Sequence, residues 1–536
     1  MPDRIGRAHR SSSEGGRFAT GRHGGVLMPL FAMPSRHSWG IGEIPDLVTF
    51  ARWLELGGLD FVQLLPLNEM QEGQSSPYSA LSAMAIDPIF IAVEQLPDWS
   101  AATGALSSDD RRTIDRARSA SRVDYDAIRA VKTRAFRAAF DLFVRQHLDR
   151  GDANDRAFAA FRERERWWLD DYALFRALHD DHQGRHWRDW EPGIRDRDPS
   201  ALDDARARLR GEVHYYSYLQ WMADVQWQSV RAAAAPVGVF GDFPFMVSGH
   251  SADVWARQHE FDLDASVGTP PDAFSVTGQD WGLPPYRWDV VAAGGFAWLR
   301  DRTRRFAALY DAFRIDHLIG FFRTYVRKPG HAPGFWPEDE AQQRAMGEHL
   351  LSLFASESAT PIAEDLGTIP DYLRVSLAAR GIPGMKVLRW ERDWHRDGHP
   401  FLDPSTYAEA SVATTGTHDT ETMAGWWDAA EPSERRAFLE LPQLRETGLA
   451  AEQPFSDRVR DAVLEVLFSS GSRLLIVPVQ DIFGWRDRIN VPAVVDDLNW
   501  TWRLPMPVDD LSTAPVAVER AHALMALTRR SGRKGF

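Results

Sequence analysis

The sequence contains no cysteine among its 536 residues. A chain without thiols cannot form disulfides, bind zinc or an iron–sulfur cluster through sulfur, or use a cysteine nucleophile. It has no apolar run of 18 residues or more, and we therefore expect no membrane span and no membrane partner. The glycine-rich loops that hold nucleotide phosphates, GxGxxG and GxxxxGK[ST], are missing, as are EF-hand and HExxH motifs. These absences disfavour thiol, nucleotide-dependent and zinc-protease chemistry.

Positive charge is also scarce relative to negative charge. The 62 Lys and Arg residues face 76 Asp and Glu residues, which leaves a net charge of −14. An acidic chain is a poor general binder of nucleic acid, so we expect no nucleic-acid partner. Tryptophan, by contrast, is abundant, with 21 residues. Its large flat face suits either a buried core or a groove for flat, hydroxylated ligands such as sugars, and composition leaves both open.

The length predicts either about three domains or one large barrel with insertions. Residues 1–23 are rich in Arg, Ser and Gly and have no apolar segment of the kind found in secretory signals, so we predict a disordered tail there. Residues 24–536 are then expected to form the catalytic region. A cysteine-free chain without a secretory signal favours the cytoplasm.

Eight short apolar runs bounded by turn residues have the pattern of buried parallel strands. Helical patterns lie between most of them, which predicts an α/β protein with a (β/α)8 TIM barrel. The runs are residues 25–31, 61–68, 238–247, 309–317, 361–365, 385–390, 411–419 and 474–481.

The spacing of these runs is uneven. We predict a helical insertion over about residues 95–235 after the second strand, because this stretch is rich in Arg, Ala and Asp with helical patterns. A second insertion, about residues 248–301 after the third strand, is rich in Gly, Pro and aromatic residues and is predicted to cover the cleft. No separate C-terminal β-domain is expected.

Polar residues end most of the predicted strands, on the side where barrels of this type carry their active sites. They are Asp242 in the third strand, Arg314, Asp316 and His317 in the fourth, Glu364 and Asp365 in the fifth, His418 and Asp419 in the seventh, and Gln480 and Asp481 in the eighth. Such carboxylates are compatible with Ca²⁺ or Mg²⁺, but no motif specifies a metal, and none is predicted. Two or three carboxylates at a Trp-rich rim are also the groups that enzymes use to cleave glycosidic bonds.

Three of these residues suggest roles by their neighbours. Arg314 and Asp316 are two residues apart on a strand, so their side chains share a face, and the guanidinium favours the ionised carboxylate that a nucleophile needs. Glu364 follows the apolar residues 361–363, a setting that raises the pKa of a carboxyl group toward that of a general acid.

At these residues the sequence resembles glycoside hydrolase family 77, the 4-α-glucanotransferases or amylomaltases. The similar segments occur in the family's order along nearly the whole chain. They are residues 39–43 (WGIGE), 63–67 (QLLPL), 76–79 (SPYS), 241–244 (GDFP), 251–255 (SADVW), 271–275 (PDAFS), 278–282 (GQDWG), 314–317 (RIDH), 363–367 (AEDLG), 384–388 (GMKVL), 415–419 (TGTHD), 488–492 (RINVP) and 499–503 (NWTWR).

The resemblance implies a role for each matching residue. Asp316 would be the nucleophile, Glu364 the general acid/base and Asp419 the carboxylate that stabilises the transition state. Residues implied to bind substrate are Tyr78 under the sugar, Asp242, Arg314, His317 and His418 around it, Asp272, Ser275, Gln279 and Trp281 in a loop over the cleft, and Asn490 nearby. No metal or organic cofactor is implied.

The sequence thus predicts a retaining 4-α-glucanotransferase that transfers segments between α-1,4-glucans or maltooligosaccharides. An α-1,4-glucan hydrolase on the same scaffold and a non-catalytic glucan-binding protein remain as alternatives. The oligomeric state, monomer or homodimer, is left open.

Overall fold

Eight parallel strands close into a barrel at the centre of the molecule. The computed structural model describes residues 16–97, 99–271, 278–492, 494 and 496–533. Neighbours around the barrel follow the order β1-β12-β11-β10-β9-β6-β3-β2. The predicted (β/α)8 barrel is confirmed, and each predicted run overlaps one strand. The strands are β1 His23–Leu27, β2 Phe61–Gln63, β3 Gly238–Phe243, β6 Ala312–Ile315, β9 Thr360–Ala363, β10 Gly384–Val387, β11 Ser411–Thr414 and β12 Leu474–Pro478.

The strands are shorter than the apolar runs that predicted them. The second run spans residues 61–68, whereas β2 ends at Gln63. Leu64, Leu65 and Leu67 stay buried beyond the last strand pair. Burial therefore continues into the segments above the barrel, and an apolar run does not mark the end of a strand.

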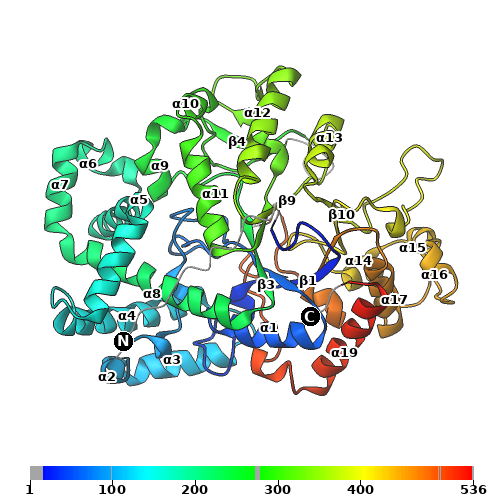
Figure 1. Cartoon of the computed structure of the whole chain (residues 1–536), viewed down its shortest axis with the longest axis horizontal. Helices are drawn as coiled ribbons and strands as arrows, with labels where there is room; N and C mark the ends of the chain where they lie inside the picture. Colours follow the sequence, from blue (N-terminus) through cyan, green and yellow to red (C-terminus); the bar gives the residue numbers. More distant parts are fainter. Residues whose placement is uncertain (1–15, 98, 272–277, 493, 495, 534–536) are drawn as a thin grey trace.

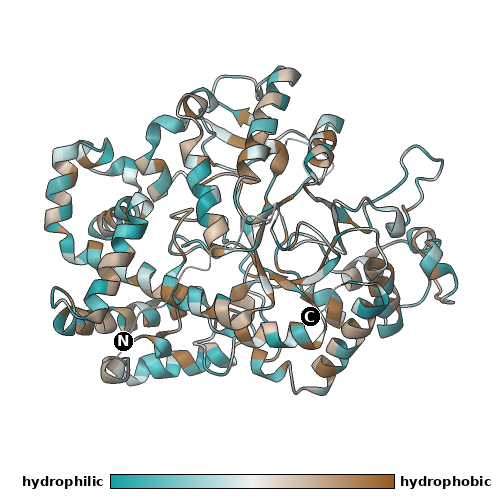
Figure 2. Ribbon diagram, viewed as in Figure 1, coloured by the Kyte–Doolittle hydropathy of each residue, from teal (hydrophilic) through white to brown (hydrophobic). Residues whose placement is uncertain are grey.

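Helices surround the barrel, and α1 (Asp46–Leu56) buries its apolar face (Figures 1 and 2). In α1 the apolar positions 47, 50, 51 and 54 follow the helical spacing and are buried. The other helices outside residues 99–234 are α9 Ala252–Ala256, α10 Trp288–Ala293, α11 Ala297–Leu309, α12 Glu340–Phe354, α13 Asp371–Arg380, α14 Met423–Ala429, α15 Pro432–Leu439, α16 Pro442–Arg445, α17 Asp457–Phe468, α18 Val479–Phe483 and α19 Pro515–Arg530, and α1 itself is Asp46–Leu56. Within the described ranges, none of the helices is both long and apolar enough to span a bilayer.

Residues 99–234 between β2 and β3 are mostly helical and lie beside the barrel, in light blue to green in Figure 1. The long helices α5 and α8 pack along each other. Acidic or hydroxyl N-caps start α3, α4 and α5, with Ser107, Asp124 and Asp152 accepting backbone N–H groups. The helices are α2 Trp99–Ala102, α3 Ser108–Ser119, α4 Tyr125–Gln146, α5 Ala153–Asp181, α6 Pro192–Arg195, α7 Pro199–Arg208 and α8 Arg210–Ala234.

The segment after β3 contributes to a second, antiparallel sheet. Its order is β5-β4-β7-β8, with β4 Ser266–Thr269, β5 Gln279–Asp280, β7 Thr324–Arg327 and β8 Gly334–Trp336. Because β4 pairs with β7, which follows β6, this segment shares its sheet with a later part of the chain. The predicted boundary at residue 301 also falls inside α11, the helix that leads into β6.

The described part of the predicted N-terminal tail, residues 16–23, contacts the barrel. Phe18 is fully buried and packs edge-on against Phe61 and Phe240, with ring centroids 5.6 and 4.7 Å away. His23 already belongs to β1. The prediction of a disordered tail is thus wrong for residues 16–23, because Phe18 packs against the barrel core and His23 pairs with β12. Residues 1–15 lie outside the described residues.

A buried lysine ties helix α4 to the barrel side. Lys132 is 1% exposed, and its Nζ lies 2.6 Å from Glu43 Oε1. It also donates to the carbonyl oxygens of Ile89 and Ile91 at 2.6 and 2.8 Å. The ammonium group is therefore fully partnered although it is out of water.

We expect Lys132→Met to destabilise the protein by about 3–5 kcal/mol, because it leaves the Glu43 carboxylate buried without its cation. Urea or thermal unfolding measures the loss. Arg112→Met on the neighbouring helix α3 is the control, since Arg112 and its partner Asp109 are both mostly exposed. That change should cost less than about 1 kcal/mol. Equal losses in the two variants would contradict the importance of burial at Lys132.

Candidate active site

The polar residues predicted at the strand ends meet at one end of the barrel. Asp242 lies in β3, Asp316 directly follows β6, and Glu364 directly follows β9. These three strands are neighbours in the barrel, which accounts for their proximity. His418 and Asp419 follow β11 and reach the same place from the other side of the barrel.

Arg314 holds three carboxylates together. Its Nη1 donates to both oxygens of Asp242 at 2.7 and 2.8 Å. Its Nη2 lies 2.8 Å from Asp316 Oδ1 and 3.8 Å from Glu364 Oε2. Burial alone would lower the pKa of Arg314, but Asp242 and Asp316 outweigh it and raise that pKa well above its usual value. A permanent cation therefore stands between the two carboxylates at the centre of the site.

Glu364 is set up to carry a proton. Burial raises its pKa to about 7, although Arg314 opposes the rise. The backbone N–H of His317 donates to Glu364 Oε2 at 2.6 Å. His317 has a positive φ of 45°, a left-handed conformation that is uncommon for a residue with a side chain and is often found at functional sites. The carboxyl group can thus exchange a proton near neutral pH.

Asp419, in contrast, is held ionised. Asn490 Nδ2 donates to its Oδ1 at 2.6 Å, and His418 Nε2 lies 3.2 Å from its Oδ2. Partial burial raises the pKa of Asp419, but His418 and the Asn490 amide outweigh it and hold that pKa well below its ordinary value. Glu364 and Asp419 therefore carry opposite protonation preferences within one site.

Tyr78 connects the two sides of the barrel mouth. Its hydroxyl donates to Asp242 Oδ2 at 2.7 Å and lies 3.1 Å from His418 Nε2. Because Asp419 accepts only, the proton of His418 must sit on Nε2, where it is shared with the Tyr78 oxygen. The Tyr78 ring stacks on the His418 ring at a centroid distance of 5.5 Å. Tyr78 is thus fixed by hydrogen bonds on both sides.

The structure describes part of the loop that is predicted to cover the cleft, including Gln279 and Trp281. Trp281 meets the His317 ring edge-on at 4.9 Å, and its Nε1 donates to Gln279 Oε1 at 3.2 Å. Its backbone N–H donates to Val267 of β4, so the antiparallel sheet sets its position. The predicted contacts Asp272 and Ser275 lie outside the described residues.

Comparisons with known proteins assign the family. The sequence profile of glycoside hydrolase family 77, described as 4-alpha-glucanotransferase, matches residues 28–509. The chain belongs to glycoside hydrolase family 77. It is 36% identical to the 4-alpha-glucanotransferase of Thermus thermophilus over 501 residues, 90% of this chain and 94% of that one. It is 31% identical to the chloroplastic/amyloplastic 4-alpha-glucanotransferase of Solanum tuberosum, covering 90% of this chain and 82% of that one.

A solved structure agrees with the family assignment. The amylomaltase from Streptococcus agalactiae, in complex with acarbose, superposes with a TM-score of 0.81 at 27% identity. The match covers 96% of this chain and 100% of that one. The fold of this family 77 member is therefore shared along nearly its whole length.

Two strand-end carboxylates of this family 77 chain serve the scaffold instead of the site. Asp365 accepts the backbone N–H of Met385 at 2.7 Å. Asp481 accepts the backbone N–H of Met423 at 2.7 Å and the hydroxyl of Thr415. Strand-end position alone did not separate them from Glu364 and Asp419, because a side chain at the rim can equally turn to a neighbouring backbone.

Sequence reasoning missed Trp500 and Arg488. The Trp500 ring lies 5.7 Å from the Tyr78 ring and 5.6 Å from the His418 ring. Arg488 Nη2 donates to the backbone oxygen of Asp419 at 2.8 Å. Both residues belong to segments that match the family's closing motifs, and that match was the available signal.

Proposed function

We propose that this protein is a retaining 4-α-glucanotransferase that moves α-1,4-glucan segments between glucan or maltooligosaccharide chains through a covalent glycosyl–Asp316 intermediate. The observation that carries the proposal is the contact of one Arg314 nitrogen with both Asp316 and Glu364, at 2.8 and 3.8 Å. The distance between Asp316 Oδ1 and Glu364 Oε2 is therefore at most the sum of these two distances. That limit on one pair of oxygens accommodates the roughly 5–5.5 Å between the carboxyl groups of retaining enzymes and lies at the lower end of the roughly 6.5–9.5 Å of inverting ones.

In the first displacement, Glu364 gives its proton to the glycosidic oxygen. The bond from the anomeric carbon to that oxygen breaks, and its electron pair stays on the departing glucan. Asp316 attacks the anomeric carbon through a carboxylate oxygen and forms an ester to the sugar. The pKa of Glu364, raised to about 7, supports its role as the acid.

In the second displacement, the 4-hydroxyl of an acceptor glucan attacks the same carbon. Glu364, now a carboxylate, takes the hydroxyl proton, and the ester bond to Asp316 breaks with its electron pair returning to Asp316. Two inversions at one carbon give net retention. Asp419, kept ionised, is proposed to stabilise the positive charge that develops on the sugar in each transition state.

The remaining site residues are proposed to bind the sugar. Their common feature is that they surround the three carboxylates or lie in the loop beside them. The proposed contacts are Tyr78, Asp242, Arg314, His317, His418 and Asn490 at the reacting sugar, and Asp272, Ser275, Gln279 and Trp281 in the cover loop. Transfer requires an acceptor hydroxyl to outcompete water, and a loop that excludes water is the physical device for it.

The proposal extends to the setting of the reaction. The residues in the site suffice for the two displacements, so the proposed turnover needs no metal or organic cofactor. The α-1,4-glucans are proposed as both donors and acceptors, in cytoplasmic glycogen, starch or maltose metabolism. The helical insertion after β2 and the cover segment after β3 are proposed as parts of one catalytic unit built on the barrel.

Incubation with maltotriose tests the reaction class. We expect glucose together with oligosaccharides longer than maltotriose, because each released glucose leaves a maltosyl group for transfer to another chain. Products are separated by chromatography at early times. Glucose and maltose without longer products would mean hydrolysis and would overturn the transfer reaction, and binding without any product would leave only a glucan-binding protein.

A further inference from the structure

Tyr78 lies in a loop whose two ends are joined at its base. This loop, residues 68–87 and named here the Tyr78 loop, connects β2 to the short 3-10 helix Pro88–Phe90. Isolated antiparallel bridges join its two sides at Asn68 with Ile86 and at Met70 with Ala80. Near the middle of the loop, the Tyr78 hydroxyl reaches Asp242 and His418 in the active site. The position of Tyr78 therefore depends on how the base of this loop is held.

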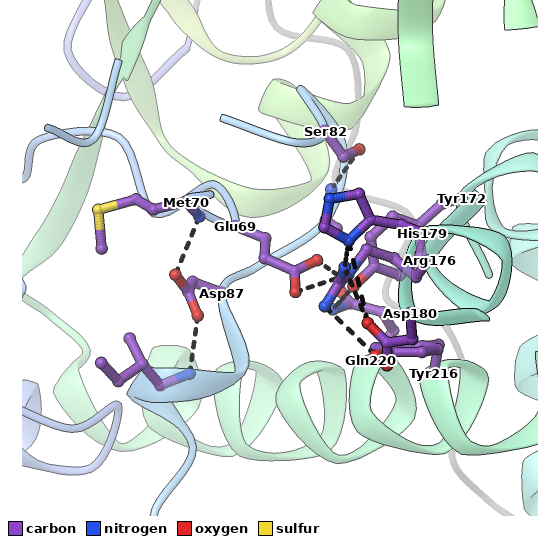
Figure 3. A network of polar contacts seen from close by, with 12 residues as sticks. Glu69, Met70, Ser82, Asp87, Tyr172, Arg176, His179, Asp180, Tyr216 and Gln220 are labelled. Atoms are coloured by element: carbon purple, nitrogen blue, oxygen red, sulfur yellow. Dashed lines mark hydrogen bonds and ion pairs between the residues drawn. The ribbon is translucent and has the colours of Figure 1, made fainter. Parts of the chain in front are cut away.

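Helices α5 and α8 of the helical insertion hold the base. Glu69 is 2% exposed and accepts the Tyr172 hydroxyl at 2.5 Å and Arg176 Nε at 3.0 Å (Figure 3). Gln220 of α8 accepts the Ile86 N–H at 3.0 Å and donates to the Ile86 carbonyl at 2.8 Å. Both sides of the loop are thus gripped by buried polar side chains from one helix pair.

Arg176 links the Tyr78 loop to the loop after β3. Its Nη1 donates to His179 Nδ1 at 3.1 Å, so the proton of a neutral His179 sits on Nε2. That Nε2 donates to His250 Nε2 at 3.1 Å, in the loop that follows the strand of Asp242. Burial lowers the pKa of His250 to about 3, so its ring is neutral at pH 7, and its Nε2 accepts in the tautomer that carries the proton on Nδ1. One guanidinium thereby spans two active-site loops, from Glu69 to His250.

We propose that Arg176 is a positioning residue for the transfer reaction: through Glu69 and the His179–His250 pair it holds the Tyr78 loop so that the Tyr78 hydroxyl stays between Asp242 and His418. The kinetic test of this assignment measures transfer and therefore rests on the proposed function. Arg176 touches none of the reacting groups. The inserted helices then act as a brace for the sugar-binding side of the barrel mouth.

Among the described residues, Arg176 is the only cation that forms an ion pair with Glu69, and replacing Arg176 removes this pair. Glu69 then sits buried without its cation and keeps the Tyr172 hydroxyl as a partner, which weakens the hold on the base of the loop. A displacement of about 1 Å at a substrate-positioning group costs on the order of 10²-fold in rate. For Arg176→Met we therefore expect kcat/KM for maltotriose to fall about 10- to 100-fold, and Arg176→Lys, which keeps the charge, to recover part of that loss.

The decisive measurement is a double-mutant cycle with Tyr78→Ala. If Arg176 acts through Tyr78, Arg176→Met should change kcat/KM by less than about twofold in the Tyr78→Ala background. Arg166→Met is the matched control, because Arg166 lies in α5 with Arg176 but is largely exposed and pairs with Glu163 at the surface. It should change kcat/KM by less than about twofold. Losses that multiply in the double variant, or an equal loss in Arg166→Met, would overturn the proposal.

Binding separates this inference from the proposed function. In an Asp316→Asn background, maltotriose affinity is measured by calorimetry with and without Arg176→Lys. We expect Arg176→Lys to fold, because lysine keeps a positive charge beside Glu69. Weaker binding with Arg176→Lys, absent when Tyr78→Ala is also present, supports positioning even if the wild-type protein fails to transfer. Unchanged binding together with unchanged kcat/KM in Arg176→Lys and Arg176→Met would overturn it.

Discussion

Asp316→Asn is expected to lower the rate of transfer from maltotriose by about 10⁴-fold or more. An amide nitrogen or oxygen in place of the carboxylate cannot form the glycosyl ester, and so neither displacement has its nucleophile. The change should leave the site assembled, because Arg314 still pairs with Asp242 through its other nitrogen. Glucan binding should therefore stay measurable by calorimetry while turnover is lost.

Asp311→Asn is the matched control for this variant. Asp311 precedes β6, at the opposite end of the strand from Asp316, and its carboxylate accepts the backbone N–H of Val239 at 2.9 Å and pairs with Arg231. Its loss should lower stability and leave kcat within a few fold at a temperature where the variant is folded. Normal transfer by Asp316→Asn would refute its assignment as the nucleophile.

Glu364→Gln is expected to lower transfer by about 10²–10⁴-fold, because a glutamine can neither protonate the leaving oxygen nor accept the acceptor's proton. A donor with a fluoride leaving group bypasses the first need, since fluoride departs without a proton. With α-maltosyl fluoride the variant should therefore still release a burst of fluoride as the glycosyl–enzyme forms. Absence of both the burst and the turnover would show that Glu364 is needed for more than proton transfer.

The pH dependence gives a second measure of the same residue. Because the pKa of Glu364 is raised to about 7, its acid form is lost as the pH rises through 7. kcat/KM for the donor should fall above that pH by up to about tenfold per unit. The fall should vanish in Glu364→Gln and persist in Glu421→Gln, where the exposed carboxylate pairs with Arg389. A fall that persists in Glu364→Gln would assign it to another group, with His418 as the first candidate.

The sequence predicted the barrel and the position of three carboxylates at its rim for a physical reason. Strands buried on both faces must be continuous apolar runs, and the eight runs stand out between polar helices. Parallel strands place their carboxyl ends at one rim, so Asp316, Glu364 and Asp419 could be expected together before any contact was known. The family resemblance then supplied Tyr78 and Asn490, which no strand pattern would have indicated.

Other features depend on contacts between distant parts of the chain. Phe18 lies in a polar stretch, and only the packing against Phe61 and Phe240 shows that it is core. The pairing of β4 with β7 joins two segments that looked separate. The brace on the Tyr78 loop uses Glu69 and Arg176, which are 107 positions apart. No local pattern encodes such pairs, because each partner taken alone looks like an ordinary charged residue.

The sequence by itself determined the chain's class of fold and its reaction family and led to the proposal of three catalytic carboxylates, since these follow from runs of apolar residues and from motifs of adjacent residues. Only the tertiary structure decided which rim carboxylates meet Arg314 in the site and which bind only scaffold groups, and in which direction the pKa of each is shifted. The direction of a side chain and the pKa of a carboxyl group depend on burial and on the neighbours it meets in space. Glu364 and Asp365 are adjacent in sequence, yet one lies against Arg314 and the other accepts the backbone N–H of Met385.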